Sequence, residues 1–377
     1  MNVADLIARC LENEKVAYIF GLPGEENLHL VDALNQSAIR FILVRSEQAG
    51  AFMADMYGRV TGKAGVCLAT LGPGAINLLL GVADAQTDSA PLVALSAQVG
   101  LDRIYKETHQ FVDLVSMFKP VTKWSDTLLS PRAAPEMIRN AFNLAQTERP
   151  GAVFLAVPQD VETMPVEASL TPLPPSEVHA ESPAPAQIAQ AAAVLETAQT
   201  PIILAGHGAA RHQAQDALIS FAEKLRIPVA TTFHGKGVFP DDHPYALGTM
   251  GFMVHDYVNF GFDQADVIVS VGYEMQEFPP QRINPRRDKQ IIHLHHFPAV
   301  VDASYNVTVD VEGDIPTTLA ALAAQVSPKP GLAATDLKIR CLLHEELERG
   351  RQDPSFPVKP QRLVADIRAA LGREDIV

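Results

Sequence analysis

Residues 42–98 read ILVRSEQAGAFMADMYGRVTGKAGVCLATLGPGAINLLLGVADAQTDSAPLVALSAQ, and the fold can be predicted outward from this stretch. The apolar, β-rich runs Val66–Thr70 and Leu92–Ser96 predict strands. Between them, Glu47–Thr61 and Ala75–Gln86 carry apolar residues at helical spacing and begin beside Gly, Ser or Pro. Strands that alternate with helices in this way predict a parallel sheet wrapped by helices.

The same alternation continues on both sides of this stretch. We expect strands at Val16–Phe20, Ile39–Val44 and Val153–Ala156. A helix is expected at Glu25–Leu34. Residues 1–165 are therefore predicted to form one doubly wound α/β domain.

A second α/β domain follows a linker. Residues 166–187 are rich in Pro, Ser and Ala without apolar periodicity, which predicts an extended segment. Residues 188–326 are expected to form a Rossmann-like domain with a parallel sheet. Its predicted elements are a helix ending near Ala198, strands at Pro201–Ala205, Pro228–Thr232, Val267–Val271 and Ile291–Leu294, and helices at Gln213–Lys224 and Pro316–Gln325.

The remaining residues suggest a third domain that is cut short. Residues 327–355 are expected to be a second linker, and 356–377 the start of the truncated domain. In the latter we expect a helix at Pro360–Leu371 and an incipient strand at Asp375–Val377.

The composition argues against several kinds of partner. Lys and Arg total 30 against 44 Asp and Glu, and the formal charge of −14 with no basic run disfavours nucleic acid. No stretch approaches the roughly 20 apolar residues that a membrane span needs, so no membrane partner is expected. Cys10, Cys67 and Cys341 lie far apart without a CxxC pair, which favours reduced thiols and a cytoplasmic location.

Three polar or glycine-rich features lie where open α/β sheets bind ligands. Glu47 is expected in the first turn of a helix, directly after a buried strand. One strand later, Gly72-Pro73-Gly74 predicts a tight turn that a ligand can approach closely, and Asn77 follows in the next helical turn. Each feature also has a simpler explanation, because carboxylates favour helix N-termini and Gly-Pro-Gly is a common turn.

In this order and spacing, the features resemble the pyrimidine-binding domain of thiamine-diphosphate-dependent enzymes of the acetolactate synthase and pyruvate oxidase branch. The resemblance covers nearly the whole chain, including GLPGEEN at 21–27 and RPGAVFLAVPQDV at 149–161. The segments PIILAGHGAARH, AEKLRIPVATT, GKGVFPDDHP and ADVIVSVGY are similar to the family's central domain. The truncated third domain would then be the diphosphate-binding domain.

The resemblance implies that Glu47 is catalytic. In the family its counterpart hydrogen-bonds N1′ of the cofactor's aminopyrimidine ring and so promotes loss of the thiazolium C2 proton. A carboxyl partly removed from water, with a raised affinity for a proton, suits that role. The activated cofactor would attack a 2-keto acid and act as an electron sink. The other residues implied to bind the cofactor are Pro23, Gly24, Thr70, Gly72, Pro73, Gly74 and Asn77.

The segment 107–124 indicates which subfamily the chain resembles. ETHQFVDLVSMFKPVTKW at 107–124 resembles the loop over the cofactor in acetolactate synthases, and its pair His109-Gln110 matches the catabolic form. Gln110 is expected to be catalytic by hydrogen-bonding substrate or intermediate, with His109 beside the substrate. Alternatively, the loop is a solvated helix entry. Lys236 is a further substrate candidate, although a solvated lysine fits equally well.

FAD is possible but disfavoured. Biosynthetic acetolactate synthases hold a structural FAD in the central domain, whereas GYEMQEFPP at 272–280 is more similar to the flavin-free catabolic enzymes. Gly206-His207-Gly208 fits either a phosphate-binding loop or a plain turn.

No metal site is expected in this chain. The family binds Mg²⁺ through a Gly-Asp-Gly segment and an Asn pair in the third domain, and Gly313-Asp314-Ile315 lacks the second glycine. His293, His295 and His296 lack a carboxylate or Cys to complete a ligand set, which favours packing or solvent exposure.

The leading hypothesis is an acetolactate synthase-like carboligase that condenses two pyruvates to 2-acetolactate and CO₂, in a catabolic route to acetoin or in branched-chain amino acid biosynthesis. Because the family's active site forms between subunits, a homodimer or homotetramer is implied. The fragment alone is expected to be inactive without its diphosphate anchor. Alternatives are a decarboxylase or carboligase of the oxalyl-CoA, benzoylformate or sulfoacetaldehyde type, or a non-catalytic binding protein.

Overall fold

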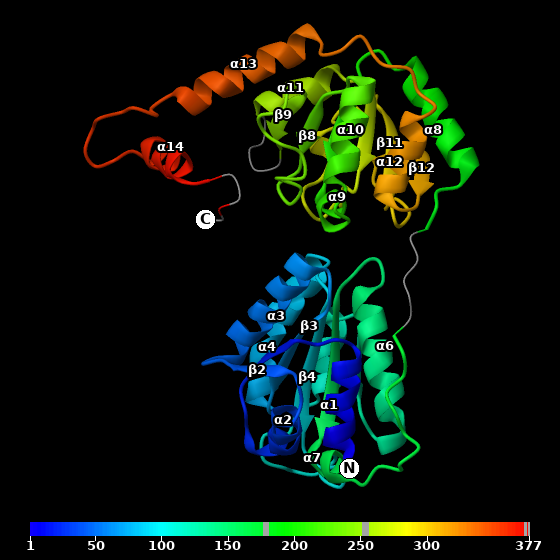
Figure 1. Cartoon of the computed structure of the whole chain (residues 1–377), viewed down its shortest axis with the longest axis vertical. Helices are drawn as coiled ribbons and strands as arrows, with labels where there is room; N and C mark the ends of the chain where they lie inside the picture. The colour runs from blue at the N-terminus through cyan, green and yellow to red at the C-terminus, as the bar shows by residue number, and fades with distance from the viewer. Residues whose placement is uncertain (176–180, 251–255, 373–374, 376–377) are drawn as a thin grey trace. The chain divides into compact units, whose positions relative to one another are not determined.

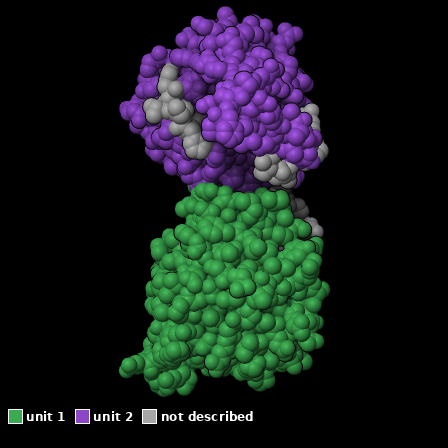
Figure 2. All heavy atoms as spheres, turned by 90° about the vertical axis from the view of Figure 1, so that its left-hand side faces the viewer, with its two compact units in different colours: residues 1–179 green, residues 180–377 purple. Residues whose placement is uncertain are grey.

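In the computed structural model the chain divides into two compact units, unit 1 (Met1–His179) and unit 2 (Ala180–Val377), coloured separately in Figure 2. The structure describes residues 1–175, 181–250, 256–372 and 375. Apart from Asp375, the strand expected at the end of the sequence lies outside the described residues. None of the helices in the described part of the chain has the length and apolar character needed to cross a bilayer.

Unit 1 is built on a six-stranded sheet in the order β2-β1-β3-β4-β6-β5, and every pair of neighbours is parallel. The strands are β1 Tyr18–Gly21, β2 Arg40–Leu43, β3 Gly65–Ala69, β4 Leu92–Gln98, β5 Trp124–Thr127 and β6 Ala152–Pro158. Five of them confirm the prediction. The sixth, β5, has the polar sequence WSDT at an edge of the sheet and therefore lacks the apolar run that marks the others.

Helices cover both faces of this sheet (Figure 1). They are α1 Val3–Asn13, α2 Leu28–Asn35, α3 Glu47–Thr61, α4 Pro73–Thr87, α5 Leu114–Phe118, α6 Ala134–Gln146 and α7 Gln159–Thr163. Val66 and Leu68 of β3 point into the core beneath α1, α2 and α6. Cys67 and Ala69 alternate to the opposite core beneath α3, α4 and α5. The predicted helix Glu25–Leu34 is divided into a 3₁₀ turn, Glu25–Asn27, and α2.

Helices α3 and α4 are held closely together. A side chain at Gly81 would bring its Cβ to 2.6 Å from Cβ of Ala51, so only glycine allows this approach. Arg59 on α3 bonds Asp55 at 3.0 Å, and it reaches Asp84 on α4 and Asp88 at the end of α4 at 2.9 and 2.8 Å. Burial raises the pKa of Asp55 to about 6, although the Arg59 guanidinium opposes the shift. This cluster fixes α3, whose first residue is Glu47.

Unit 2 repeats the architecture with the strand order β12-β11-β10-β7-β8-β9, again all parallel. Its strands are β7 Ile202–Ala205, β8 Val229–Thr231, β9 Ala246–Thr249, β10 Val267–Val271, β11 Gln290–His295 and β12 Val307–Glu312. Its helices are α8 Pro185–Thr197, α9 His207–Arg211, α10 Gln215–Leu225, α11 Tyr257–Gln264, α12 Ile315–Ala323, α13 Ala334–Glu348 and α14 Pro360–Ala370. β9, β12 and α11 were not predicted, and the turn expected at 206–208 is the start of α9.

The segment 327–355, expected to be a linker, contains helix α13. Ile339 on this helix is 1% exposed in the core that also holds α11. Nη1 of Arg340 donates to the carbonyls of His243 and Ala246 at 2.8 and 2.5 Å. Nζ of Lys329 donates to the carbonyl of Glu196 at 2.8 Å. The segment is therefore packed on unit 2 rather than extended, whereas α14 has no buried residue.

Candidate functional site

The candidate site lies at the carboxyl edge of the unit 1 sheet, where the strand order changes direction. From β1 the chain moves outward to β2 and then returns to the opposite side of β1 at β3. Ligands of open α/β sheets bind at such a point, outside the carboxyl ends of the strands. The loop after β1, residues 22–27, and the turn after β3, residues 70–72, meet there.

Glu47 is buried at this edge. It is the first residue of α3, follows the extended residue Ser46, and is 8% exposed. Nδ2 of Asn77, on α4, donates to Oε2 of Glu47 at 3.0 Å. Oε1 lies 3.4 Å from the position that a Cβ on Gly74 would occupy. One carboxylate oxygen is therefore held by an amide, and the other faces Gly74.

Thr70 lies between the two loops. Its Oγ1 donates to Oε2 of Glu26 at 2.8 Å, which joins the end of β3 to the segment after β1. A Cβ on Gly24 would overlap Cβ of Thr70, and one on Gly74 would lie 2.8 Å from its Cγ2. Glycine at both positions therefore lets the two loops pack closely around Thr70.

The loop that carries His109-Gln110 reaches the same edge. Gly72 has φ +53°, and a Cβ there would overlap the carbonyl oxygen of Gln110. Nε2 of Gln98, at the end of β4, donates to the carbonyl of Val112 at 3.0 Å and fastens the loop's far end. The side chains of His109 and Gln110 are exposed, with Gln110 in the left-handed region at φ +56°.

Most of the predicted site residues are brought together at this edge of the unit 1 sheet, and Asn77 bonds Glu47 directly. Pro23 is exposed beside Gly24 at the same edge. Lys236 belongs to unit 2, where its Nζ pairs with Asp241 at 2.7 Å. The sequence reading did not assign Glu26. Glu26 could have been found from its position, because it is a carboxylate two residues after Gly24 in a loop that follows a buried strand.

These residues fit an aminopyrimidine ring. Such a ring offers nitrogen atoms in its plane to hydrogen bonding and a flat face to packing. The buried carboxylate of Glu47 can share a proton with a ring nitrogen. Because Gly74 has no side chain, its backbone and Oε1 of Glu47 lie close together, and a Cβ there would come 2.8 Å from Cγ2 of Thr70. The chemistry available is proton transfer at a heterocycle, in a position partly shielded from water.

A second buried carboxyl group, that of Glu162, holds the start of α2 next to this edge. Oε2 of Glu162, on α7, accepts a hydrogen bond from the amide of Leu30 in the first turn of α2 at 3.1 Å. Burial raises the pKa of Glu162 to about 8, although that hydrogen bond lowers it. Among the residues that the structure describes, its other oxygen, Oε1, has no hydrogen-bond partner. Glu162 thus fixes the start of α2, directly after the Glu26 segment.

We predict that Glu162 makes unit 1 less stable as pH rises. The folded state binds the proton more tightly than the unfolded state, whose pKa is near the ordinary 4.5. The contribution of Glu162 to the free energy of unfolding is therefore fully present below about pH 4.5 and is lost as pH rises through about 8. In the wild type this makes the free energy of unfolding fall by up to about 1.4 kcal/mol per pH unit, and Glu162→Gln should remove that dependence.

Urea unfolding between pH 5.5 and 8.5 checks this, because the protein's one tryptophan, Trp124, lies in unit 1 and reports its unfolding. The exposed residue Glu136, in the first turn of α6, provides the matched control as Glu136→Gln. An identical pH slope in wild type and Glu162→Gln would show that Glu162 is not the titrating group.

The carboxyl edge of the unit 2 sheet is filled by protein groups. The strand order changes between β7 and β10, and a Cβ on Gly206 would lie 2.5 Å from Cα of Tyr273. Arg211 bonds Oε1 of Glu274 at 2.6 Å, and His295 lies 3.7 Å from the same oxygen. Burial alone would raise the pKa of Glu274, but His295 and Arg211 outweigh it and lower that pKa. Burial lowers the pKa of His295 to about 4, so it is neutral near pH 7.

The neighbouring histidines also make hydrogen bonds inside unit 2. Nδ1 of His293 lies 2.9 Å from Oη of Tyr305, and Nδ1 of His295 accepts from the amide of His296 at 2.9 Å. Within the described residues, no group of three or more His, Cys, Asp or Glu side chains could hold a metal ion.

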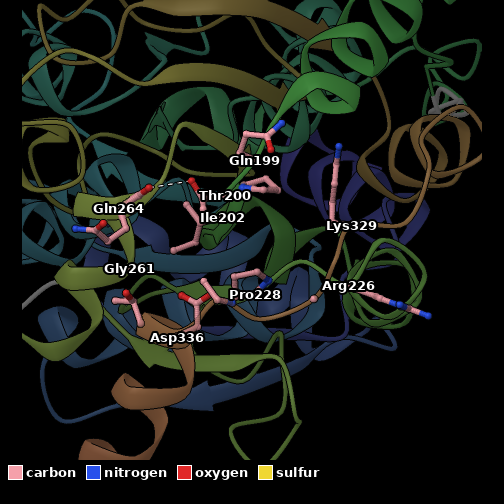
Figure 3. Close-up of a pocket in the computed structure, with 13 residues that line it drawn as sticks. Gln199, Thr200, Ile202, Arg226, Pro228, Gly261, Gln264, Lys329 and Asp336 are labelled. Atoms are coloured by element: carbon pink, nitrogen blue, oxygen red, sulfur yellow. Dashed lines mark hydrogen bonds between the residues drawn. The ribbon is translucent and has the colours of Figure 1, made fainter.

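A small cavity in unit 2 lies at the opposite edge of its sheet (Figure 3). It is lined by residues at the starts of β7 and β8, together with Lys329 and Asp336 from the segment that leads into α13. Oγ1 of Thr200 donates to the carbonyl of Gln264 at its wall, at 2.9 Å. Its volume of about 30 Å³ admits one water molecule and excludes a substrate.

The chain is similar in sequence to known families and proteins. Residues 1–117 match the family described as thiamine pyrophosphate enzyme, N-terminal TPP binding domain, and residues 188–322 match its central domain. The chain is 34% identical to a probable acetolactate synthase large subunit of Methanocaldococcus jannaschii, over 100% of the chain. It is 34% identical to an acetolactate synthase of Bacillus subtilis and 35% identical to a catabolic acetolactate synthase of Raoultella terrigena, over 98% and 96% of the chain. It spans 65% of the length of each of these relatives.

Proposed function

Because the chain belongs to the thiamine pyrophosphate enzyme family, whose N-terminal and central domains it contains, we propose that it forms part of an acetolactate synthase-like carboligase. The proposed reaction condenses two pyruvates and a proton to 2-acetolactate and CO₂. The observation that carries the proposal is Glu47, buried at the ligand-binding edge with one oxygen bonded to Asn77 and the other facing Gly74. The relatives named acetolactate synthase support the choice of substrate.

Each site residue has a proposed role. When bound, thiamine diphosphate supplies a carbon nucleophile and holds the electrons released on decarboxylation. Glu47 shares a proton with a nitrogen of its pyrimidine ring, and Asn77 keeps the Glu47 carboxylate in place. Pro23 and Gly24, with the turn Gly72-Pro73-Gly74 and Thr70, form the pocket for that ring. The exposed side chains of His109 and Gln110 are available to the substrate.

The remaining assignments follow from the family and are proposals of the same kind. Residues 1–165 are the pyrimidine-binding domain and residues 188–326 the central domain, consistent with the two matched regions. Mg²⁺, which the family resemblance implies, is proposed to bind the cofactor's diphosphate, and we assign it no ligand among residues 1–377. Lys236 pairs with Asp241 in this structure. We keep it as a candidate for contact with the substrate, in the site of a partner subunit or in another conformation of the chain.

We propose that the central domain holds no flavin. A dinucleotide would need the crevice between the loops after β7 and β10. A Cβ on Gly272 would overlap the amide of Ala209, so these loops already touch. The buried group of Arg211, Glu274 and His295 fills the space behind them. These residues do not fit FAD.

We propose that the protein acts as a homodimer or a larger homo-oligomer. Met53, Met56 and Val60 are exposed apolar side chains spaced along one face of α3, and Leu80 on α4 is also exposed. These helices carry Glu47 and Asn77, so a second subunit that covers this face would close the site from water. The free thiols Cys10, Cys67 and Cys341 are consistent with a reducing, cytoplasmic location.

Incubation of the full-length protein with thiamine diphosphate, Mg²⁺ and pyruvate tests the proposal. Acetolactate, measured as acetoin after acid treatment, should form in equal amount to CO₂. Formation of CO₂ and acetaldehyde without acetolactate would identify a decarboxylase. No turnover of pyruvate, with turnover of another 2-keto acid, would move the protein to a different member of the cofactor class.

A further inference from the structure

We propose that Glu26 is a positioning residue of the cofactor pocket, acting through Thr70. This inference deepens the proposed function and rests on it. Oε2 of Glu26 accepts a hydrogen bond from Oγ1 of Thr70 at 2.8 Å. Thr70 in turn lies close to both Gly24 and Gly74, and Gly74 lies next to Oε1 of Glu47.

Glu26 is presented by an ordered segment. Oδ1 of Asn27 accepts a hydrogen bond from the amide of Gly24 at 2.8 Å, and Asn27 is fully buried. The amide of Leu30 donates to Glu162, which holds the first turn of α2 directly after this segment. Because both ends of the short 3₁₀ turn are fixed, the Glu26 carboxylate has a defined place at the point where β1 and β3 lie side by side.

The hydrogen bond selects one orientation of Thr70. Threonine has two substituents on Cβ and a few staggered rotamers, so fixing Oγ1 also fixes Cγ2. With Oγ1 bonded to Glu26, the methyl group Cγ2 is the part that faces Gly74, 2.8 Å from the position of a Cβ there. The part of Thr70 that faces Gly74 is therefore apolar.

Without Glu26, the Thr70 hydroxyl would lose its acceptor. The hydroxyl could then rotate toward Gly74, whose Cβ position lies 3.4 Å from the carboxylate oxygen Oε1 of Glu47. A hydroxyl that donates to Glu47 would compete with the ring nitrogen for the same oxygen. Glu26 thus keeps the proton-sharing oxygen of Glu47 available for the cofactor.

A set of variants in the full-length protein tests this. Glu26→Ala should weaken thiamine diphosphate binding and lower kcat about tenfold, with KM for pyruvate changed less, because a hydrogen bond to a charged acceptor is lost. Glu26→Gln should restore both to within about threefold, since its amide oxygen still accepts from Thr70. Glu25→Ala is the matched control, because Glu25 is the adjacent, exposed carboxylate, and it should behave as wild type.

The decisive comparison is made in a Thr70→Val background. Valine keeps the shape of threonine without the hydroxyl, so adding Glu26→Ala should change cofactor affinity and kcat less than about twofold. Cofactor affinity is measured by calorimetry, and the melting temperature without cofactor should match between Glu26→Ala and Glu25→Ala.

An equal effect of Glu26→Ala in both backgrounds, or none in the wild-type background, overturns the inference alone. Absence of thiamine diphosphate binding by the wild type would overturn the proposed function as well.

Discussion

Glu47→Gln lowers the turnover of the full-length protein by a factor of about 100 or more, the size expected when a proton-transfer group is lost. Glutamine has the shape of glutamate and can still bond Asn77, which reaches Oε2 at 3.0 Å in the wild type. It has no carboxyl proton to share with a ring nitrogen. The fold should therefore survive while the chemistry fails.

Turnover, cofactor affinity and melting temperature of this variant should be measured together. Glu136→Gln is the matched control, because Glu136 also lies in the first turn of a unit 1 helix and is exposed. It makes the same change of charge away from the site and should keep activity within about twofold, since exposed substitutions have small effects. Wild-type turnover in Glu47→Gln would show that Glu47 is not the proton-transfer group. An equal loss of turnover in Glu136→Gln would attribute the effect to helix stability.

The sequence predicted the central strands and helices well because their signals are local. β3 is an unbroken apolar run, and β10 is apolar except for Ser270. Helix α3 is capped by Ser46 before Glu47 and by Gly62 after Thr61, and the φ of +68° at Gly62 suits glycine. β5 and α13 were missed because their signals are weak: β5 is a polar edge strand, and α13 buries only Asp336 and Ile339. Their placement depends on tertiary packing.

The candidate site was predictable only in part for a similar reason. The distance along the chain from Glu47 to Asn77 belongs to a recognisable pattern, and the two side chains do meet. The bond from Thr70 to Glu26 joins residues 44 positions apart. It forms because β1 pairs with β3 on one side and with β2 on the other, and a single sequence does not state the order of parallel strands.

Gly72→Ala should reduce activity about 100-fold, because displacing catalytic groups by about 1 Å has effects of this size. Gly72 has φ +53° and ψ −119°, a conformation that side chains other than glycine's rarely adopt. An added Cβ would also overlap the carbonyl oxygen of Gln110. Either the turn before α4 or the loop with His109 and Gln110 must move, and both border the space beside Glu47.

Gly62→Ala separates backbone strain from displacement of the site. Gly62 also has positive φ, at +68°, but in the described part of the chain no atom beyond its own neighbours lies within 4 Å of its Cβ position. This variant should lose about 1 kcal/mol of stability and keep its turnover, because alanine is strained there without a clash. Gly72→Ala should lose both stability and cofactor affinity, measured by melting temperature and calorimetry. If the two variants lose the same activity, strain alone explains the loss, and the contact between Gly72 and Gln110 does not shape the site.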